Sequence, residues 1–398
     1  MPVWHELSKS WRESHDLVVL GIAQEQHPER CDLYARWQGF DWPILWDPFN
    51  LTEARAVPIV YAIDEAGMVR AIRPNPATFE AEFLERDFGA GAARPGDVAE
   101  SSGTELVECA AHDPSSAEGT MWQALSQLLF ADGAVRPIDA TVGALRLFSA
   151  QHPEDARALF RLGVALRMRY DSAQRQGSDF QDALLAWSGA LTARPNEYIW
   201  RRRIQQYGPA LDKPYPFYPW VDEALAALVD RGEAVPVLSA ALTQSERAAP
   251  QRRFVGAEDA VEPDPEGAIL RDDGGWLEVD TAVAHHTDAA DPVARVHVAF
   301  RPRTDSGVHW NNEAEPLVVW FGDETLPDGW ALGSQWVRVA GETSDVVSSE
   351  VRSAEVELRL PPGAKGTLSG YALFYACEDV DGVCTYLRRD FTVDVVAR

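Results

Sequence analysis

The spacing of apolar residues changes twice along the chain, which divides the sequence into three segments. Residues 1–90 alternate between helical and strand patterns. Residues 119–250 repeat their apolar positions about every 3.6 residues, the period of amphipathic helices. In residues 272–398, apolar and polar residues alternate, as in strands with one buried face. The pattern predicts a multidomain protein with an α/β, an all-α and an all-β part.

The first segment predicts the element order α-β-α-β-β-α. The continuous apolar run LVVLGI at residues 17–22 is typical of a buried strand in a parallel sheet. Pro28 at the start of the next helical pattern and Gly39 just past its end are helix start and stop signals. The elements expected are helices at 3–11, 28–37 and 77–84 and strands at 17–22, 58–63 and 68–72, the last two forming a hairpin.

Two stretches rich in Gly, Pro, Ser and acidic residues separate the segments, and such compositions are typical of linkers. The third segment contains six clear strand patterns and a seventh, QWVRV, between Gly, Pro and Asp turns. That number of strands favours an antiparallel sandwich. The domains expected are 1–90, 119–250 and 272–398, joined by linkers at 91–118 and 251–271.

The composition restricts the function classes. The 62 acidic and 36 basic residues give a net charge of −26, which excludes general nucleic-acid binding, because that affinity depends on neutralising phosphates with basic surface. A hydrophobic share of 46% excludes a disordered chain. No stretch approaches the roughly 18 apolar residues of a membrane helix, and no signal-peptide pattern is present. The nine histidines and four cysteines show no metal-ligand spacing, and we expect neither a metal nor a cofactor.

Three stretches of the first segment carry a resemblance to a known family. They are LVVLGIA, the step from Val57 to Pro58 that enters a strand, and the hairpin IDEAGMVRAI. Together they resemble the thioredoxin-like redoxins of the AhpC/TSA and TlpA kind. The resemblance implies a thioredoxin-like fold in which Pro58 is the cis-proline opposite the catalytic cysteines. A proline accepts the cis bond at about 0.5 to 1 kcal/mol, and the same bend would also shape the strand entry without any catalytic role.

The catalytic CxxC of that family has no counterpart in the chain. In the family a proline follows the second cysteine within the first helix, and Pro2 takes the place of that proline. The first strand and both cysteines would then lie before Met1, so we expect a truncated gene model; the alternative is that another part of the chain fills the gap. Cys31 falls in the second helix and Cys109 in the linker. Neither replaces the missing pair, and we expect both to be structural or incidental.

Two stretches of the helical segment, LFSAQHPEDARALFRLGVAL and AWSGALTARPNEYIWRRRI, place a helix, a proline turn and another helix in the same order. They resemble tetratricopeptide repeats, which implies packed helix pairs without catalytic residues. Between Arg157 and Arg203 there are nine arginines and four acidic residues. We interpret this cluster as a solvated face or one that docks on an acidic neighbouring domain. The alternative is a groove for an acidic peptide or protein partner.

The third segment carries a second cysteine pair. The stretches SGVHWNNEAEP, LPDGW and GYALFYACEDVDGVCTY resemble the immunoglobulin-like N-terminal domain of DsbD thiol:disulfide interchange proteins. The resemblance implies that Cys377 and Cys384 bridge a hairpin loop and exchange electrons, with Cys384 forming the mixed disulfide with a partner. Glu378, Asp379 and Asp381 lie between them, and their charge disfavours a thiolate. A structural disulfide and unpaired thiols remain alternatives.

Two functions are therefore expected. The first is a redoxin-type thiol-disulfide oxidoreductase with a helical-repeat adaptor, in which Cys384 is the nucleophile and Cys377 resolves the mixed disulfide with a protein thiol or a thioredoxin-like partner. The alternative is a non-catalytic interaction protein with a degenerate thioredoxin fold, peptide-binding repeats and a structural disulfide. Domains of the DsbD and TlpA kinds work outside the cytoplasm, so the resemblance implies an extracytoplasmic location.

Overall fold

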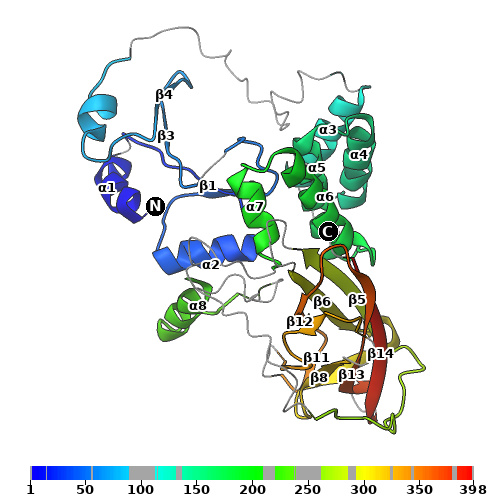
Figure 1. Cartoon of the computed structure of the whole chain (residues 1–398). Helices are drawn as coiled ribbons and strands as arrows, with labels where there is room; N and C mark the ends of the chain where they lie inside the picture. Colours follow the sequence, from blue (N-terminus) through cyan, green and yellow to red (C-terminus); the bar gives the residue numbers. More distant parts are fainter. Residues whose placement is uncertain are drawn as a thin grey trace. The chain divides into compact units, whose positions relative to one another are not determined.

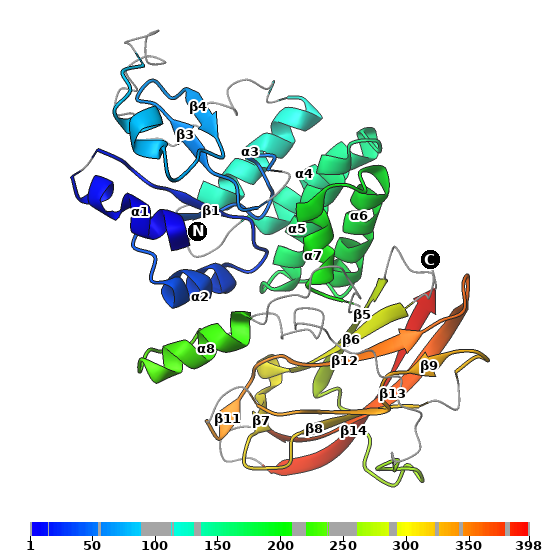
Figure 2. The same cartoon turned by 60° about the vertical axis from the view of Figure 1, so that its left-hand side comes forward.

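The chain folds into helices and sheets that form two compact units (Figures 1 and 2). The computed structural model describes residues 2–14, 16–54, 57–88, 113, 115–130, 137–208, 220–236, 238, 261–285, 293–322, 326–341, 345–378 and 383–396. Unit 1 consists of Met1–Met168, Gly189–Arg201 and Trp220–Pro236, and unit 2 of Arg169–Ser188, Arg202–Pro219 and Val237–Arg398. Among the described residues, no helix is long and apolar enough to cross a membrane.

The N-terminal part of unit 1 contains two small sheets. Strands β1 and β2 pair in parallel, and β3 and β4 pair antiparallel. The elements are α1 (Pro2–Glu13), β1 (Gly21–Ala23), α2 (Pro28–Gln38), β2 (Ile44–Trp46), β3 (Tyr61–Ile63), β4 (Val69–Ile72) and the π-helical turn η1 (Glu80–Leu84). The helix predicted at 28–37 is confirmed as α2. It ends as predicted at Gly39, whose φ of 64° allows its N–H to bond back to the last turn.

The strand predicted at residues 17–22 is wrong in its bounds and its burial. Only Gly21 and Ile22 of this run belong to β1, and Val18 and Leu20 are 80% and 56% exposed. Strand β2, which the sequence analysis did not predict, is the neighbour of β1 in the sheet. The sheet is short and one of its faces stays open, so the apolar run lacks the second covering layer of a buried parallel strand.

The helical part of the chain follows the proline turns. Pro153 lies in the turn between α4 and α5, and Pro195 lies between α6 and α7, as predicted. Helix α3 packs against α4, and α8 packs against α2 within unit 1. The helices are α3 (Ala117–Phe130), α4 (Ile138–Gln151), α5 (Ala156–Tyr170), α6 (Asp179–Ala193), α7 (Tyr198–Gln205) and α8 (Trp220–Asp230). The boundary between the two units passes through α5, α6 and α7. The division into domains at 1–90, 119–250 and 272–398 stays a prediction.

The C-terminal part of unit 2 consists of two antiparallel sheets. One has the order β10-β8-β13-β7-β11 with β14 paired to β13, and the other has the order β5-β6-β12-β9. All seven predicted strands are confirmed, and β7, β9 and β11 add to them. The strands are β5 (Leu277–His285), β6 (Val293–Pro302), β7 (Val308–Asn311), β8 (Leu317–Phe321), β9 (Ala331–Leu332), β10 (Trp336–Val339), β11 (Val347–Ser348), β12 (Arg352–Arg359), β13 (Lys365–Glu378) and β14 (Cys384–Val396).

One hydrophobic core lies between these two sheets. Val298 and Phe300 of β6 contribute from the smaller sheet, and Trp310 of β7 and Phe374 of β13 from the larger one. All four side chains are at most 1% exposed. The alternation of apolar and polar residues predicts this arrangement, because every second side chain of a strand points to the same face.

Candidate functional site

The two cysteines of the third segment form a disulfide. Cys377 is the last residue of β13 that pairs with β14, and Cys384 begins β14. The two residues face each other in the antiparallel ladder, with their Cα atoms 4.0 Å apart. The ladder continues from this pair along the full length of the hairpin. The disulfide therefore joins the two strands at the end where the connecting loop leaves them.

The two cysteine residues differ in their access to solvent. Cys377 is 3% exposed, whereas Cys384 is exposed. Strand β7 runs alongside, with His309 in register with Cys377. Asn311 of the same strand donates a hydrogen bond from Nδ2 to Sγ of Cys384 at 3.5 Å. A donor of this kind stabilises a negative charge on the sulfur that accepts it.

An aromatic pair lies on the same face of the hairpin as the disulfide. Tyr375 and Tyr386 are two residues from Cys377 and Cys384 along their strands, so all four side chains share one face. The two rings pack at 4.5 Å between centroids. Burial raises the pKa of Tyr386, which keeps its hydroxyl protonated. The disulfide is thus bordered on this face by two uncharged aromatic side chains.

The other predicted residues lie elsewhere. The Val57–Pro58 peptide bond is cis, and Pro58 belongs to unit 1, whereas the disulfide belongs to unit 2. Cys31 is half-buried in the first turn of α2. Cys109 lies outside the described residues. Within the described ranges, no group of three His, Cys, Asp or Glu residues could hold a metal ion.

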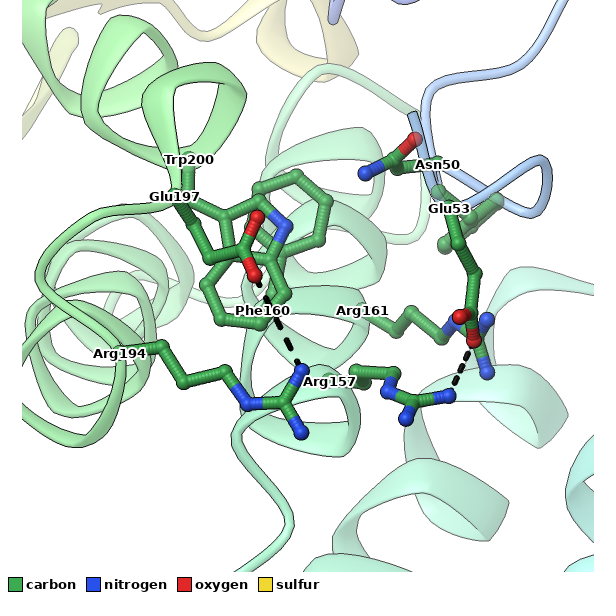
Figure 3. Close-up of a pocket in the computed structure, with 9 residues that line it drawn as sticks. Asn50, Glu53, Arg157, Phe160, Arg161, Arg194, Glu197 and Trp200 are labelled. Carbon is green, nitrogen blue, oxygen red and sulfur yellow. Dashed lines mark hydrogen bonds and ion pairs between the residues drawn. The ribbon is translucent and has the colours of Figure 1, made fainter. Parts of the chain in front are cut away.

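Unit 1 contains a pocket that the sequence analysis did not predict (Figure 3). Its empty space is about 390 Å³, part of it open to solvent. The segment after β2 contributes Phe49, Asn50 and Glu53, and α5 contributes Arg157, Phe160 and Arg161. Arg194, Glu197 and Trp200 come from the α6–α7 region. The residues lie about 50, 160 and 195 positions into the chain, and only the tertiary fold brings them together.

The arginine cluster of the helical segment is only partly a solvated face. The buried members are Arg161, Arg167, Arg169 and Arg203. Arg169 is paired with the buried Asp179 at 2.5 Å. The interpretation as a solvated face is therefore wrong for these four residues, whereas docking on an acidic neighbouring domain stays a prediction. Arginine side chains can bury their aliphatic stems, and in Arg169 the guanidinium group still reaches a charged partner.

Comparisons with known proteins do not place the chain in a family. No protein-family model matches the sequence, and no curated protein matches it. One partly similar solved structure is described as "X-ray structure of Northeast Structural Genomics Consortium target SoR45". The similarity covers 30% of this chain and 86% of that chain, at 7% sequence identity and a TM-score of 0.18. A similarity this weak carries no argument about the fold or the function.

Proposed function

We propose that the Cys377–Cys384 disulfide exchanges electrons with a protein thiol, and that Cys384 forms the mixed disulfide. The observation that carries the proposal is the difference in exposure between the two cysteine residues. An attacking thiolate reaches the exposed Sγ of Cys384, whereas Cys377 is covered by the sheet. The hydrogen bond from Asn311 to Sγ of Cys384 supports the same assignment, because it stabilises the thiolate released at the end of the reaction.

The exchange takes two steps. A thiolate of the partner attacks Sγ of Cys384, a new S–S bond forms, and the Cys377–Cys384 bond breaks with Cys377 leaving as a thiolate that takes up a proton. A second thiolate of the partner then attacks the partner's sulfur in the mixed disulfide and releases Cys384. The partner's two thiols become a disulfide, and the chain accepts two electrons and two protons. In the reverse direction Cys384 is the nucleophile and Cys377 is the resolving residue.

We further infer the finer folds that the resemblances imply. Two antiparallel sheets around one core, with a disulfide at the end of a hairpin, support an immunoglobulin-like sandwich of the DsbD kind for residues 272–398. The helix-proline-helix order supports tetratricopeptide-like repeats in residues 119–250. The α-β-α start supports a thioredoxin-like domain in residues 1–90. A redox partner of the thioredoxin kind and an extracytoplasmic location belong to the same proposal.

Single-cysteine variants test which sulfur reacts. In a background with Cys31→Ser and Cys109→Ser, the variant Cys377→Ser keeps the exposed thiol and Cys384→Ser keeps the buried one. Both are mixed with a thioredoxin variant that lacks its resolving cysteine and carries an activated disulfide. We expect Cys377→Ser to form the mixed disulfide and Cys384→Ser to form little. Equal trapping of both variants, or faster trapping of Cys384→Ser, would contradict the assignment.

The reduction potential separates the exchange function from a structural disulfide. An exchanging pair should be reduced by thioredoxin, whose potential is about −270 mV. A potential well below about −300 mV, together with resistance to reduced thioredoxin, would overturn the proposal and favour the interaction protein. Replacing Asn311 with Leu in the Cys377→Ser variant gives a second readout. We expect the pKa of the Cys384 thiol to rise, because its hydrogen-bond donor is lost.

A further inference from the structure

The pocket of unit 1 contains a buried cation. Arg161 is 6% exposed, and its Nε has no hydrogen-bond partner among the described residues. Its guanidinium lies over the ring of Trp122, 4.8 Å from the ring centroid. Burial lowers the pKa of Arg161, although Glu53 and Asp155 attract the charge. A charge buried in this way is unfavourable unless a counter-ion pairs with it.

The other charges that line the pocket are already paired. Arg157 forms an ion pair with Glu53, and Arg194 forms one with Glu197 at 3.9 Å (Figure 3). Each pair sums to zero, so Arg161 is the one lining residue whose charge no other lining residue neutralises, while Asp155 and Asp47 attract it from beyond the lining. The pocket therefore complements a ligand group with a single negative charge better than one with two.

Two further polar atoms in the pocket lack partners within the described part of the chain. They are Nε1 of Trp200, which can only donate, and Oδ1 of Asn50, which can only accept. The orientation of the Asn50 amide is fixed, because its Nδ2 donates to the carbonyl of Ala54 at 3.0 Å. Both residues are at most 7% exposed. The pocket thus offers two donors and one acceptor that no described group uses.

The remaining wall of the pocket is aromatic. The rings of Phe160 and Trp200 are stacked, with their centroids 5.1 Å apart and their planes 13° from parallel. Phe49 is 1% exposed and borders the same space. Phe160 and Trp200 are 1% and 3% exposed, and the apolar wall that they form with Phe49 suits an apolar or aromatic ligand substituent.

We propose that this pocket binds the carboxylate of an organic acid that carries an N–H group beside the carboxylate and an apolar substituent, as in an N-acyl amino acid. Arg161 and Nε1 of Trp200 donate to the carboxylate, and Oδ1 of Asn50 accepts from the N–H. The substituent packs against the apolar wall that Phe49, Phe160 and Trp200 form. A carboxylate with an N–H group beside it also ends every peptide chain, so the ligand is either a free N-acyl amino acid or the carboxyl terminus of a peptide.

Titration calorimetry on the full chain tests the chemistry of the ligand. The probes are N-acetyl-L-phenylalanine and its carboxamide, which differ only in the negative charge. We expect the acid to bind and the amide to bind about tenfold to a hundredfold more weakly, because the charge-assisted hydrogen bonds are lost. An N-acetyl tripeptide ending in phenylalanine separates the two sources: tighter binding than the single amino acid indicates a peptide terminus, and weaker binding indicates a free acid. No binding of the acid, or equal binding of acid and amide, would overturn the proposal.

The variant Arg161→Met tests the residue. Methionine keeps an unbranched apolar side chain that can pack near Trp122 but removes the guanidinium group and its charge. We expect it to bind the acid at least about tenfold more weakly, whereas Arg36→Met, which removes a positive charge paired with Glu233 outside the pocket, should bind normally.

Stability without ligand separates a binding role from a structural one. If Arg161 serves a ligand, Arg161→Met should unfold at the same temperature as the parent chain or a higher one, because an unpaired buried charge has been removed. Unchanged affinity in Arg161→Met, or a marked loss of stability in the ligand-free variant, would contradict the proposal.

Discussion

The strands of unit 1 and the strands of unit 2 carry similar apolar residues but bury them differently. In β1 to β4 and the run before β1, many apolar side chains are exposed, among them Val18, Ile22, Ile63 and Ile72. In unit 2 two sheets enclose one core, and Val298 of β6 is completely buried. An apolar pattern therefore shows that one face of a sheet is able to pack against another element. Whether that face is buried depends on a second sheet or a helix layer that covers it.

The largest expected effect is the loss of a core side chain in unit 2. Trp310→Ala removes a fully buried indole and its hydrogen bond to the carbonyl of Glu350. We expect the free energy of unfolding of unit 2 to fall by about 3 to 5 kcal/mol, measured by chemical denaturation. Trp336→Ala, at a position that is 43% exposed, is the matched control and should cost far less. Equal losses in the two variants would mean that Trp310 does not lie in the core of unit 2.

The second effect is reduction of the disulfide. Opening Cys377–Cys384 should cost unit 2 about 2.5 kcal/mol by the entropy of loop closure, and it should leave the unfolding transition of unit 1 unchanged. Denaturation curves with and without a phosphine reductant measure both. A shift of the unit 1 transition by the same amount would show that the two transitions are not separate.

The third test applies one substitution to both regions. Valine and threonine have the same shape, so Val298→Thr places a hydroxyl in the core and should cost about 1 to 3 kcal/mol. Val18→Thr, at a position that is 80% exposed, should change stability by less than about 0.5 kcal/mol. A large loss in Val18→Thr would reveal that this face is covered in solution.

The smallest effect concerns the β3–β4 hairpin of unit 1, where polar contacts replace a core. The hydrogen bond from the backbone N–H of Met68, and then the contact with Arg70, lower the pKa of Asp64. A lowered folded-state pKa stabilises the fold above the unfolded value of about 3.9, and this stabilisation is lost as the pH falls through the folded value. We expect Asp64→Asn to be less stable than the parent chain at pH 6, with the difference shrinking toward pH 3 in denaturation experiments. A difference that does not change with pH would exclude this contribution of the Asp64 charge.

The sequence predicts best where neighbours along the chain decide the structure. The helix at 28–37 and the strands of unit 2 followed from Pro28, Gly39 and the alternation of apolar residues. The pairing of Cys377 with Cys384 was predictable for the same reason, because only seven positions separate them. Residues 17–22 were predicted as a buried strand, since a continuous apolar run does not show whether other elements cover it.

The candidate pocket was not predictable because it depends on distant contacts. Asn50 and Arg161 are more than a hundred positions apart, and no local pattern connects them. Arginine is also a residue type that usually lies on the surface, although the fold buries Arg161. The cluster of nine arginines was the one feature of the sequence that pointed to this pocket. It did not show that Arg161 is the member whose Nε lacks a hydrogen-bond partner among the described residues.

Strand β13 changes its neighbour along its length. Residues Gly370 to Leu373 pair with β8, and residues Ala376 to Glu378 pair with β7. The end of β13 that contains Cys377 is therefore paired with β7 over Ala376 to Glu378. The pairing of Gly370 to Leu373 with β8 does not depend on that contact. Opening the disulfide would raise amide hydrogen exchange at Ala376 to Glu378 and leave exchange at Gly370 to Leu373 slow. The hydrogen-exchange rates of these few backbone amides would therefore report whether the disulfide is oxidised or reduced.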